Sequence, residues 1–338
     1  MNEYVILKPT RCAVVDIGRP CNVKCDFCYY IWQNDKKEWM SWDEAKRQID
    51  ASKKRGNTLI DVTGGEPTLY PHMKEFVEYA HETGQKVCII TNGLCGESKL
   101  NSLIEAGTDI FRISMHGKVE VHDKIVHKDG ARKEQIRFLY QLENNSKVKQ
   151  FHLNYVLVKD TQNDLVDFAK VYSKYSKFKK FAIINFLPHY EWAASEKAVQ
   201  MVADLRVAQN QIEEAFSILE GAKIGCDIRY YPMCRIKESL RRTVCNDLQV
   251  MFDPWEWDYS ANPKTFTHYK AFGENISNNI EEKGQPCCTC AIHKVCGGIN
   301  KAMNKSNSGM VDPIYGEIID DAFHYRKYNI LTQVRHVL

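Results

Sequence analysis

The chain lacks the sequence features that would place it in or across a membrane. No run of 18 apolar residues occurs among its 338 residues, so no helix is expected to span a bilayer. The first eight residues, MNEYVILK, lack the apolar core of a secretory signal peptide. We therefore expect a cytoplasmic protein.

An excess of charge of one sign is also missing. Lys and Arg total 46 against 43 for Asp and Glu, and the net charge of +3 argues against nucleic acid as the main partner. The hydrophobic fraction of 44% and the charged fraction of 26% are typical of a soluble globular chain. The length leaves room for one large domain and a small one.

Cysteine, in contrast, is abundant, with 13 residues. In a small secreted domain such a number would indicate disulfides. This chain is long and has no secretory signal, so we expect a reducing environment in which several thiols bind metal.

Three of these cysteines, Cys21, Cys25 and Cys28, are separated by gaps of three and two residues. They are too crowded for ordinary disulfides, and an odd number cannot pair internally. Soft thiolates favour iron–sulfur clusters, and three ligands leave one iron open to another molecule. A zinc knuckle without its fourth ligand and chance clustering are the alternatives.

The run CNVKCDFC resembles the hallmark of the radical S-adenosylmethionine (SAM) enzymes, Cys-x3-Cys-x2-Cys with an aromatic residue, here Phe27, before the third Cys. The resemblance implies that the open iron of a [4Fe–4S] cluster chelates SAM. One electron then cleaves the sulfonium to methionine and a 5′-deoxyadenosyl radical, which takes a hydrogen atom from the substrate. Phe27 is assigned to the cofactor site on this resemblance.

Apolar runs alternate with amphipathic runs over the first two-thirds of the chain, which indicates parallel βα units. The pattern alone leaves a doubly wound sheet and a barrel open, and the resemblance implies an α/β fold with a partial (β/α)6 TIM-like barrel. The expected strands are 13–17, 58–63, 86–91, 109–115, 150–158 and 181–187, and the expected helices are 41–52, 71–82, 131–143, 162–174 and 196–220. We expect the barrel over 1–222, a small Cys-rich domain over 223–310 and a tail over 311–338.

The motif Gly64-Gly65-Glu66-Pro67 follows the second expected strand. Adjacent glycines let the backbone bend and approach a ligand closely. The resemblance assigns Gly64, Gly65 and Glu66 to the amino group of SAM, which suits a carboxylate beside backbone carbonyls.

Polar residues at two later strand ends are further cofactor candidates. Ser114 and Asn154 are assigned to SAM, with a satisfied core polar group as the alternative for each. His116 is a candidate to face the substrate. The sequence Thr91-Asn92-Gly93 is similar to a family motif but by itself predicts only a turn.

A second cysteine set lies in the last third of the chain. The spacing Cys287-x2-Cys290-x5-Cys296, with Cys234 and Cys245 upstream, resembles the SPASM and twitch domains, which carry auxiliary clusters. A full SPASM pattern has a further Cys where this chain has Asn300, and the hairpin of the family reads Asp253-Pro254 here. We therefore expect one auxiliary [4Fe–4S] cluster held by four of the five cysteines, with a zinc site as the alternative.

The substrate is the least determined property. We expect hydrogen abstraction from a small polar metabolite such as an aminosugar, aminocyclitol or nucleoside, in an oxidation, dehydration or epimerisation. The alternative is maturation of a ribosomally made peptide by a crosslink, thioether or epimerisation; since the cysteine motif begins at residue 21, no leader-gripping domain is expected. An iron–sulfur sensor or carrier is a third possibility. Flavodoxin or ferredoxin is the expected electron donor. Candidate catalytic residues are Cys95, His116 and Cys288, and candidate bases also include Asp253, Glu256 and His324.

Overall fold

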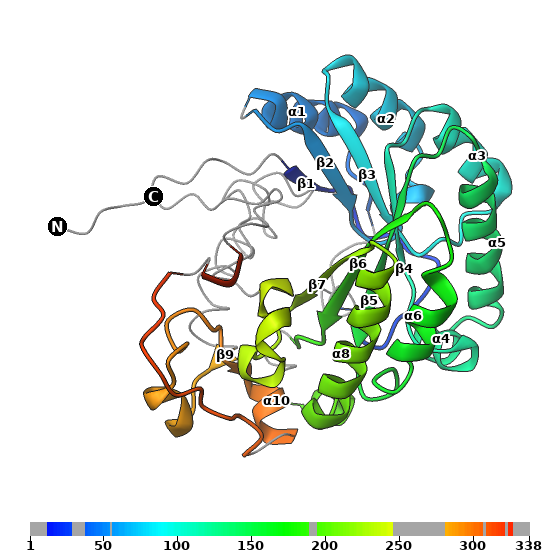
Figure 1. The fold of residues 1–338 in the computed structure, drawn as a ribbon. Coiled ribbons are helices and arrows are strands. Elements are labelled where there is room, and N and C mark those ends of the chain that lie inside the picture. The colour runs from blue at the N-terminus through cyan, green and yellow to red at the C-terminus, as the bar shows by residue number, and fades with distance from the viewer. Residues whose placement is uncertain are drawn as a thin grey trace.

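The computed structural model describes residues 12–28, 38–54, 56–188, 195–245, 281–306, 309–321 and 324–326. Its centre is a parallel sheet of eight strands in the order β1 to β8, wrapped into a half-barrel (Figure 1). The strands are β1 (Cys12–Asp16), β2 (Leu59–Thr63), β3 (Lys86–Thr91), β4 (Ile110–Ser114), β5 (Phe151–Leu157), β6 (Phe178–Asn185), β7 (Gly225–Arg229) and β8 (Val244–Cys245).

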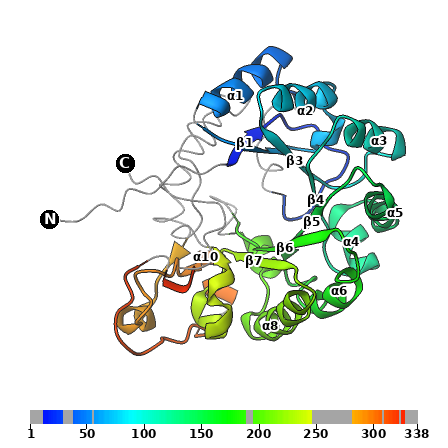
Figure 2. The same cartoon turned by 45° about the horizontal axis from the view of Figure 1, so that its top comes forward.

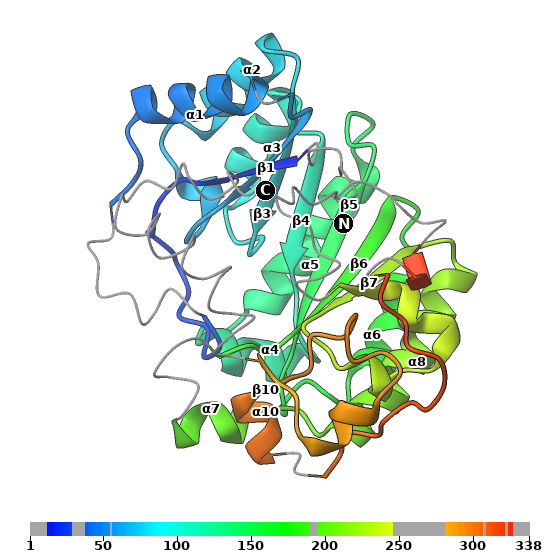
Figure 3. The same ribbon diagram turned by 90° about the vertical axis from the view of Figure 1, so that its left-hand side faces the viewer.

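Helices cover the outer face of this sheet, as the crescent in Figure 2 shows. They are α1 (Trp42–Lys54), α2 (Met73–Glu82), α3 (Glu97–Glu105), α4 (Val119–Val126), α5 (Ala131–Asn144), α6 (Leu165–Tyr172) and α8 (Leu205–Gly221). The short helix α7 (Glu196–Met201) precedes α8 and lies apart from this layer (Figure 3). Short 3-10 turns are η2 (Pro67–Leu69), η4 (Met233–Arg235), η5 (Glu238–Thr243), η7 (Gln285–Thr289) and η8 (His324–Arg326).

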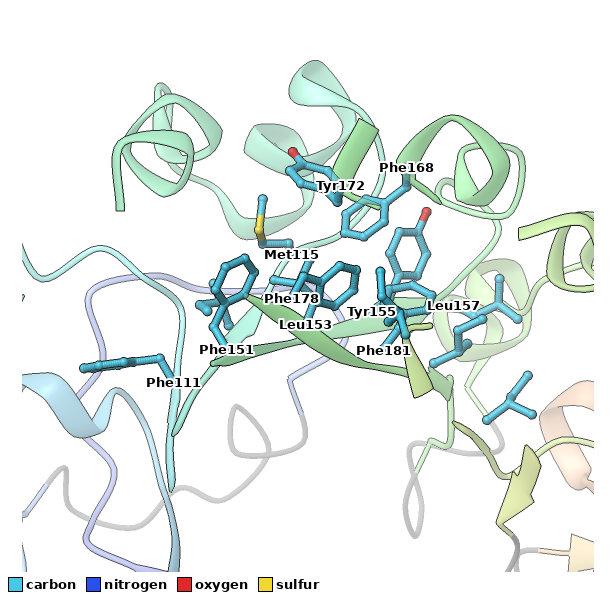
Figure 4. Close-up of a cluster of buried hydrophobic side chains, with 14 of the residues drawn as sticks. Phe111, Met115, Phe151, Leu153, Tyr155, Leu157, Phe168, Tyr172, Phe178 and Phe181 are labelled. Atoms are coloured by element: carbon cyan, nitrogen blue, oxygen red, sulfur yellow. The ribbon is translucent and has the colours of Figure 1, made fainter. Parts of the chain in front are cut away.

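The apolar core lies between the sheet and these helices. Alternate residues of a strand point to opposite faces, and the outward set is apolar. Figure 4 shows this layer around β5 and α6. The ring of Tyr155 contacts that of Phe168 edge-on with 5.2 Å between the ring centroids, and the centroids of Phe168 and Phe181 are 5.4 Å apart. Burial of such a layer drives the folding of the barrel wall.

The inner face of the same strands is polar. Arg112 on β4 pairs with Asp61 on β2 at 2.6 Å, and Lys180 on β6 pairs with Asp227 on β7 at 2.6 Å. His152 lies between them, because it is the register partner of both Arg112 and Lys180. The barrel wall therefore has an apolar outside and a charged inside.

The C-terminal region adds β9 (Glu281–Glu282), which pairs antiparallel with β10 (Ile299–Asn300), and α10 (Lys301–Ser306). Helix α10 lies beside α7 (Figure 3), where the Ser306 hydroxyl donates to the Val199 carbonyl at 2.8 Å. Asn300 donates to the Phe186 carbonyl just past the end of β6 at 3.3 Å. This region thus packs beside the carboxyl end of β6.

The predicted α/β partial barrel is confirmed, and all six expected strands are present within a few residues. The expected end of the alternation near residue 223 was wrong, because β7 and β8 continue the same parallel sheet. The predicted domain boundary at 222 stays a prediction. Among the described residues, no helix is long and apolar enough to cross a membrane.

The helix expected at 196–220 is two helices. Val202 has an extended backbone, and Asp204 begins α8 by accepting hydrogen bonds from the Arg206 and Val207 amides at 2.8 and 3.2 Å. In a continuous helix these amides would donate to carbonyls four residues earlier in the chain, so their bonds to the Asp204 side chain mark the start of a separate helix. The short helices α3 and α4 were not expected.

Candidate cofactor and cluster site

The segment 21–28, called the cluster loop here, follows β1 and carries Cys21, Cys25 and Cys28. Its Lys24 and Asp26 amides donate to the Val126 and Ile125 carbonyls at the end of α4, at 3.2 and 2.9 Å. These carbonyls belong to a last helical turn and need partners from outside the helix. The loop is therefore fastened to the carboxyl end of α4.

The loop also buries apolar side chains at this place. Val23, Cys25 and Phe27 pack against a small cluster whose members are Leu94, Ile125, Val126 and Ala131. Phe27 meets the ring of His116 edge-on at 4.8 Å. At the surface, Asp26 pairs with His127 at 3.1 Å and with Lys197 of α7 at 3.2 Å.

The three thiols of the loop lie close enough to influence one another. Burial raises the pKa of Cys21 to about 11, and the nearby Cys28 contributes to the same rise. Burial, then Cys28 and Cys21, raise the pKa of Cys25 further. Grouped, half-buried thiols are costly to ionise without a compensating cation, and iron supplies that charge. The donor set therefore fits a cluster held by these three sulfurs.

The two glycines after β2 make room for the chain that enters the cluster loop. The Gly65 amide donates to the Gly18 carbonyl at 2.8 Å and the Glu66 amide to the Pro20 carbonyl at 2.9 Å. A Cβ on Gly65 would lie 2.2 Å from the Pro20 oxygen, and a Cβ on Gly64 2.4 Å from the Gly18 oxygen. The expected close approach is thus to the protein's own backbone, and contact of Gly64 and Gly65 with SAM stays a prediction.

Glu66 has only 1% of its surface exposed, and its carboxylate accepts four hydrogen bonds. Oε1 accepts from the Thr68 amide and hydroxyl and from the Thr91 hydroxyl, at 3.1, 2.6 and 2.6 Å. Oε2 accepts from the Asn92 amide at 2.6 Å. Burial raises its pKa, and these donors oppose the rise. Glu66 thus joins the ends of β2 and β3, and its predicted contact with the SAM amino group remains untested.

Asn92 links this carboxylate to the cluster loop. Its Nδ2 donates to Asn22 Oδ1 at 2.7 Å and lies 4.0 Å from Cys21 Sγ. Gln135 of α5 donates to the carbonyls of Asn92 and Ser114, at 2.7 and 2.8 Å. Sequence reasoning missed Asn22 and Gln135 and treated Asn92 as part of a turn; only the similarity of residues 91–93 to a family motif hinted at this link.

Ser114 and Asn154 are register partners on β4 and β5, and their contact with SAM stays a prediction. His116 follows β4, and its Nδ1 accepts the Val156 amide at 2.9 Å, which assigns the ring proton to Nε2. Burial and the nearby His122 and Arg132 hold the pKa of His116 well below its usual value. His116 is therefore neutral, and its Nδ1 is occupied.

The other catalytic candidates differ in how far they are buried. Cys95 is half-buried and its pKa is raised to about 11 by burial and then by Glu66, which keeps it a thiol. Cys288 is exposed on η7, and His324 is exposed on η8. Asp253 and Glu256 lie outside the described residues.

Of the second cysteine set, the structure groups three. The pKa of Cys234 is raised by burial and also by Cys287 and Cys290, and that of Cys287 by burial and by Cys290. The buried Cys290 and Cys296 sulfurs accept the Ile314 and Gly298 amides at 3.3 and 3.4 Å. Cys245 ends β8 and is buried.

Asn300, at the position where a SPASM pattern has a cysteine, has a structural role. Its Oδ1 accepts the Met303 amide at 2.7 Å and so caps α10. Within the described ranges, no group of three or more His, Cys, Asp or Glu is arranged to hold a single metal ion.

Comparison with known proteins agrees with this geometry. Residues 15–171 match the model of the Radical SAM superfamily. This match covers just under half of the chain and agrees with the resemblance of the cysteine motif to the family.

Among curated relatives, an Fe-coproporphyrin III synthase of Methanosarcina barkeri is 33% identical over 38% of this chain and 33% of its own length. A GTP 3′,8-cyclase of Actinobacillus pleuropneumoniae serotype 7 is 35% identical over 33% of each chain. The chain thus spans about a third of the length of these two proteins.

Solved structures share the fold. Streptococcus suis SuiB bound to precursor peptide SuiA has a TM-score of 0.54 at 18% identity, over 66% of this chain and 49% of that one. Histidine-tagged anSMEcpe with bound AdoMet has a TM-score of 0.51 at 21% identity, over 65% and 61%.

Proposed function

We propose that the chain cleaves SAM reductively and uses the resulting radical to take a hydrogen atom from a small polar metabolite. The observation that carries this proposal is the grouping of the Cys21, Cys25 and Cys28 thiols on one loop beside the carboxyl ends of β2 to β4. In barrels of parallel strands, chemistry collects at these ends. A bound [4Fe–4S] cluster would supply the electron to SAM, and flavodoxin or ferredoxin would reduce it.

Hydrogen bonds within the protein hold the strand ends and the cluster loop of the site together. Glu66 ties β2 to β3, Gln135 ties the end of β3 to that of β4, and Asn92 ties β3 to the cluster loop. Ser114 and Asn154 are the candidates for hydroxyl groups of SAM. Prearranged polar groups lower the cost of ordering a reactive cofactor.

The inner face of the barrel supports a polar substrate. Asp61, Arg112, Lys180 and Asp227 place charges there, and His152, whose pKa burial lowers to about 3, adds a neutral polar ring. An apolar substrate would strip water from these groups without replacing their hydrogen bonds. An aminosugar, aminocyclitol or nucleoside offers such bonds on several sides.

Peptide maturation is the second candidate, favoured by the fold shared with SuiB, whose structure includes a precursor peptide. The GTP 3′,8-cyclases among the relatives favour a nucleoside-like substrate instead. A short precursor-peptide gene beside this gene would support the peptide; neighbouring sugar or nucleoside genes would support the metabolite.

We further propose one auxiliary [4Fe–4S] cluster on Cys234, Cys287 and Cys290, with Cys245 or Cys296 as fourth ligand. The influence of Cys287 and Cys290 on the pKa of Cys234, and of Cys290 on that of Cys287, supports their proximity. In a variant with Cys21, Cys25 and Cys28 all changed to Ala, about four irons per chain should remain. A count near zero would remove the auxiliary cluster, and its loss on adding C287A and C290A would locate it.

The main proposal is tested by anaerobic reconstitution with iron and sulfide, followed by dithionite and SAM. We expect release of 5′-deoxyadenosine from the wild-type protein and none from the triple variant C21A/C25A/C28A. Absence of 5′-deoxyadenosine with dithionite, flavodoxin and ferredoxin alike would contradict the proposal and favour a sensor or electron carrier.

A further inference from the structure

Asn92 holds a position between the buried Glu66 carboxylate and the first cysteine of the cluster loop. It lies 70 residues from Asn22 and 71 from Cys21 along the chain. Its backbone amide donates to the Glu66 carboxylate, and its backbone carbonyl accepts from Gln135 Nε2. The peptide groups before and after Asn92 are therefore both held by buried side chains. The main chain at Asn92 therefore has little freedom to move.

The orientation of the Asn92 side chain is fixed as well. Its Oδ1 accepts the Leu94 amide at 2.9 Å, so Nδ2 must face the cluster loop. Asn22 is oriented in turn, because its Nδ2 donates to the Leu94 carbonyl at 2.9 Å and leaves Oδ1 to accept from Asn92. Asn22 and Asn92 therefore fix each other's orientation, and each is also bonded to the backbone of Leu94.

One hydrogen on Asn92 Nδ2 is used by Asn22, and an amide nitrogen carries two. The second is available to Cys21 Sγ, which lies 4.0 Å away. A thiolate that binds iron is a better acceptor than a thiol, and hydrogen bonds to the sulfurs of a cluster change its reduction potential.

We propose that Asn92 is a positioning residue of the SAM cluster, which holds Cys21 through an N–H···S contact and makes the cluster easier to reduce. The reason is electrostatic: a donor at the sulfur stabilises the extra negative charge of the reduced cluster more than the charge of the oxidised one. Glu66 and Asn22 act through Asn92 by holding it in place. This inference rests on the proposed function, since it requires a cluster on Cys21.

The test compares N92A, N22A and the control N101A in anaerobically reconstituted protein. Asn101 is an exposed residue of α3, so N101A makes the same chemical change away from the site. The signal to follow is the reduced-cluster paramagnetic signal that C21A/C25A/C28A loses. Its midpoint potential and the rate of iron loss to a chelator are measured without SAM or substrate.

We expect N92A to have a more negative midpoint potential and a faster loss of iron than wild type. N22A should show a smaller shift in potential, because Asn92 keeps an N–H toward Cys21, and N101A should show none. If N92A holds no cluster, N92D takes its place: it retains an acceptor for the Leu94 amide, removes both N–H groups, and should also shift the midpoint to more negative values.

A midpoint and an iron-loss rate in N92A equal to those of N101A would overturn the inference, as would an unshifted midpoint in N92D. Wild-type protein that never shows the reduced-cluster signal would instead contradict the proposed function. The two failures are therefore distinguishable.

Discussion

Replacing Gly65 by Ala tests whether this glycine is needed for the packing of the cluster loop. The added Cβ would lie 2.2 Å from the Pro20 oxygen and 2.4 Å from the Arg19 oxygen. Contacts of a real Cβ atom essentially never fall under 3.0 Å, so the chain entering the cluster loop must move by about 0.8 Å or more. Both obstructing atoms belong to the backbone and cannot turn away as a side-chain end could.

We expect G65A to lower the free energy of unfolding by about 1–3 kcal/mol, the usual cost of overpacking. It should also lower the iron bound by the SAM cluster, because residues 19 and 20 lead directly into Cys21. The measurements are chemical denaturation and iron per chain after reconstitution.

Gly221 gives a matched control, because a Cβ there would meet nothing within 4 Å. It ends α8, where Ala is the better helix former, so G221A should be neutral or stabilising by up to about 1 kcal/mol. G65A protein with the iron content and stability of G221A would refute the argument from packing.

Three further predictions follow from the same contacts. E66Q places an amide nitrogen against the Asn92 N–H or a Thr68 donor, and should lower the free energy of unfolding by about 2–3 kcal/mol in chemical denaturation. Wild-type stability would contradict the role of Glu66 in joining β2 to β3. Burial lowers the folded-state pKa of His122 and His152 to about 3, so the unfolded chain takes up protons first. Stability should therefore fall as the pH drops below about 6.5, by about 1–2 kcal/mol per histidine at pH ~5.5, and a flat profile between about pH 7.5 and 5.5 would count against it. D204A removes the cap of α8 and should lower the free energy of unfolding by about 1 kcal/mol. Its midpoint of unfolding should lie below that of the control D167A, which changes an exposed Asp in the first turn of α6.

The local pattern of the chain was enough to predict the βα units, and the three thiols of the expected first metal site lie on one loop. Apolar runs such as residues 86–91 became strands because both local propensity and burial favour them. The spacing of Cys21, Cys25 and Cys28 places the thiols on one short loop whatever surrounds it. β7 was missed because it lacks an apolar run, with Ile228 as its one buried residue. The two-residue β8 is too short for a pattern and is defined by its neighbour in the sheet.

The roles of Gly65, Glu66 and Asn92 were decided by tertiary structure. The sequence indicated a tight turn with a carboxylate, which suits a ligand, but the partners that fill this space come from residues 18–22 and 91–92. The grouping of Cys234 with Cys287 and Cys290 is likewise a matter of long-range packing. Covalent spacing determines which thiols can share a loop, whereas hydrogen bonds between distant segments determine which buried polar groups are left for a ligand.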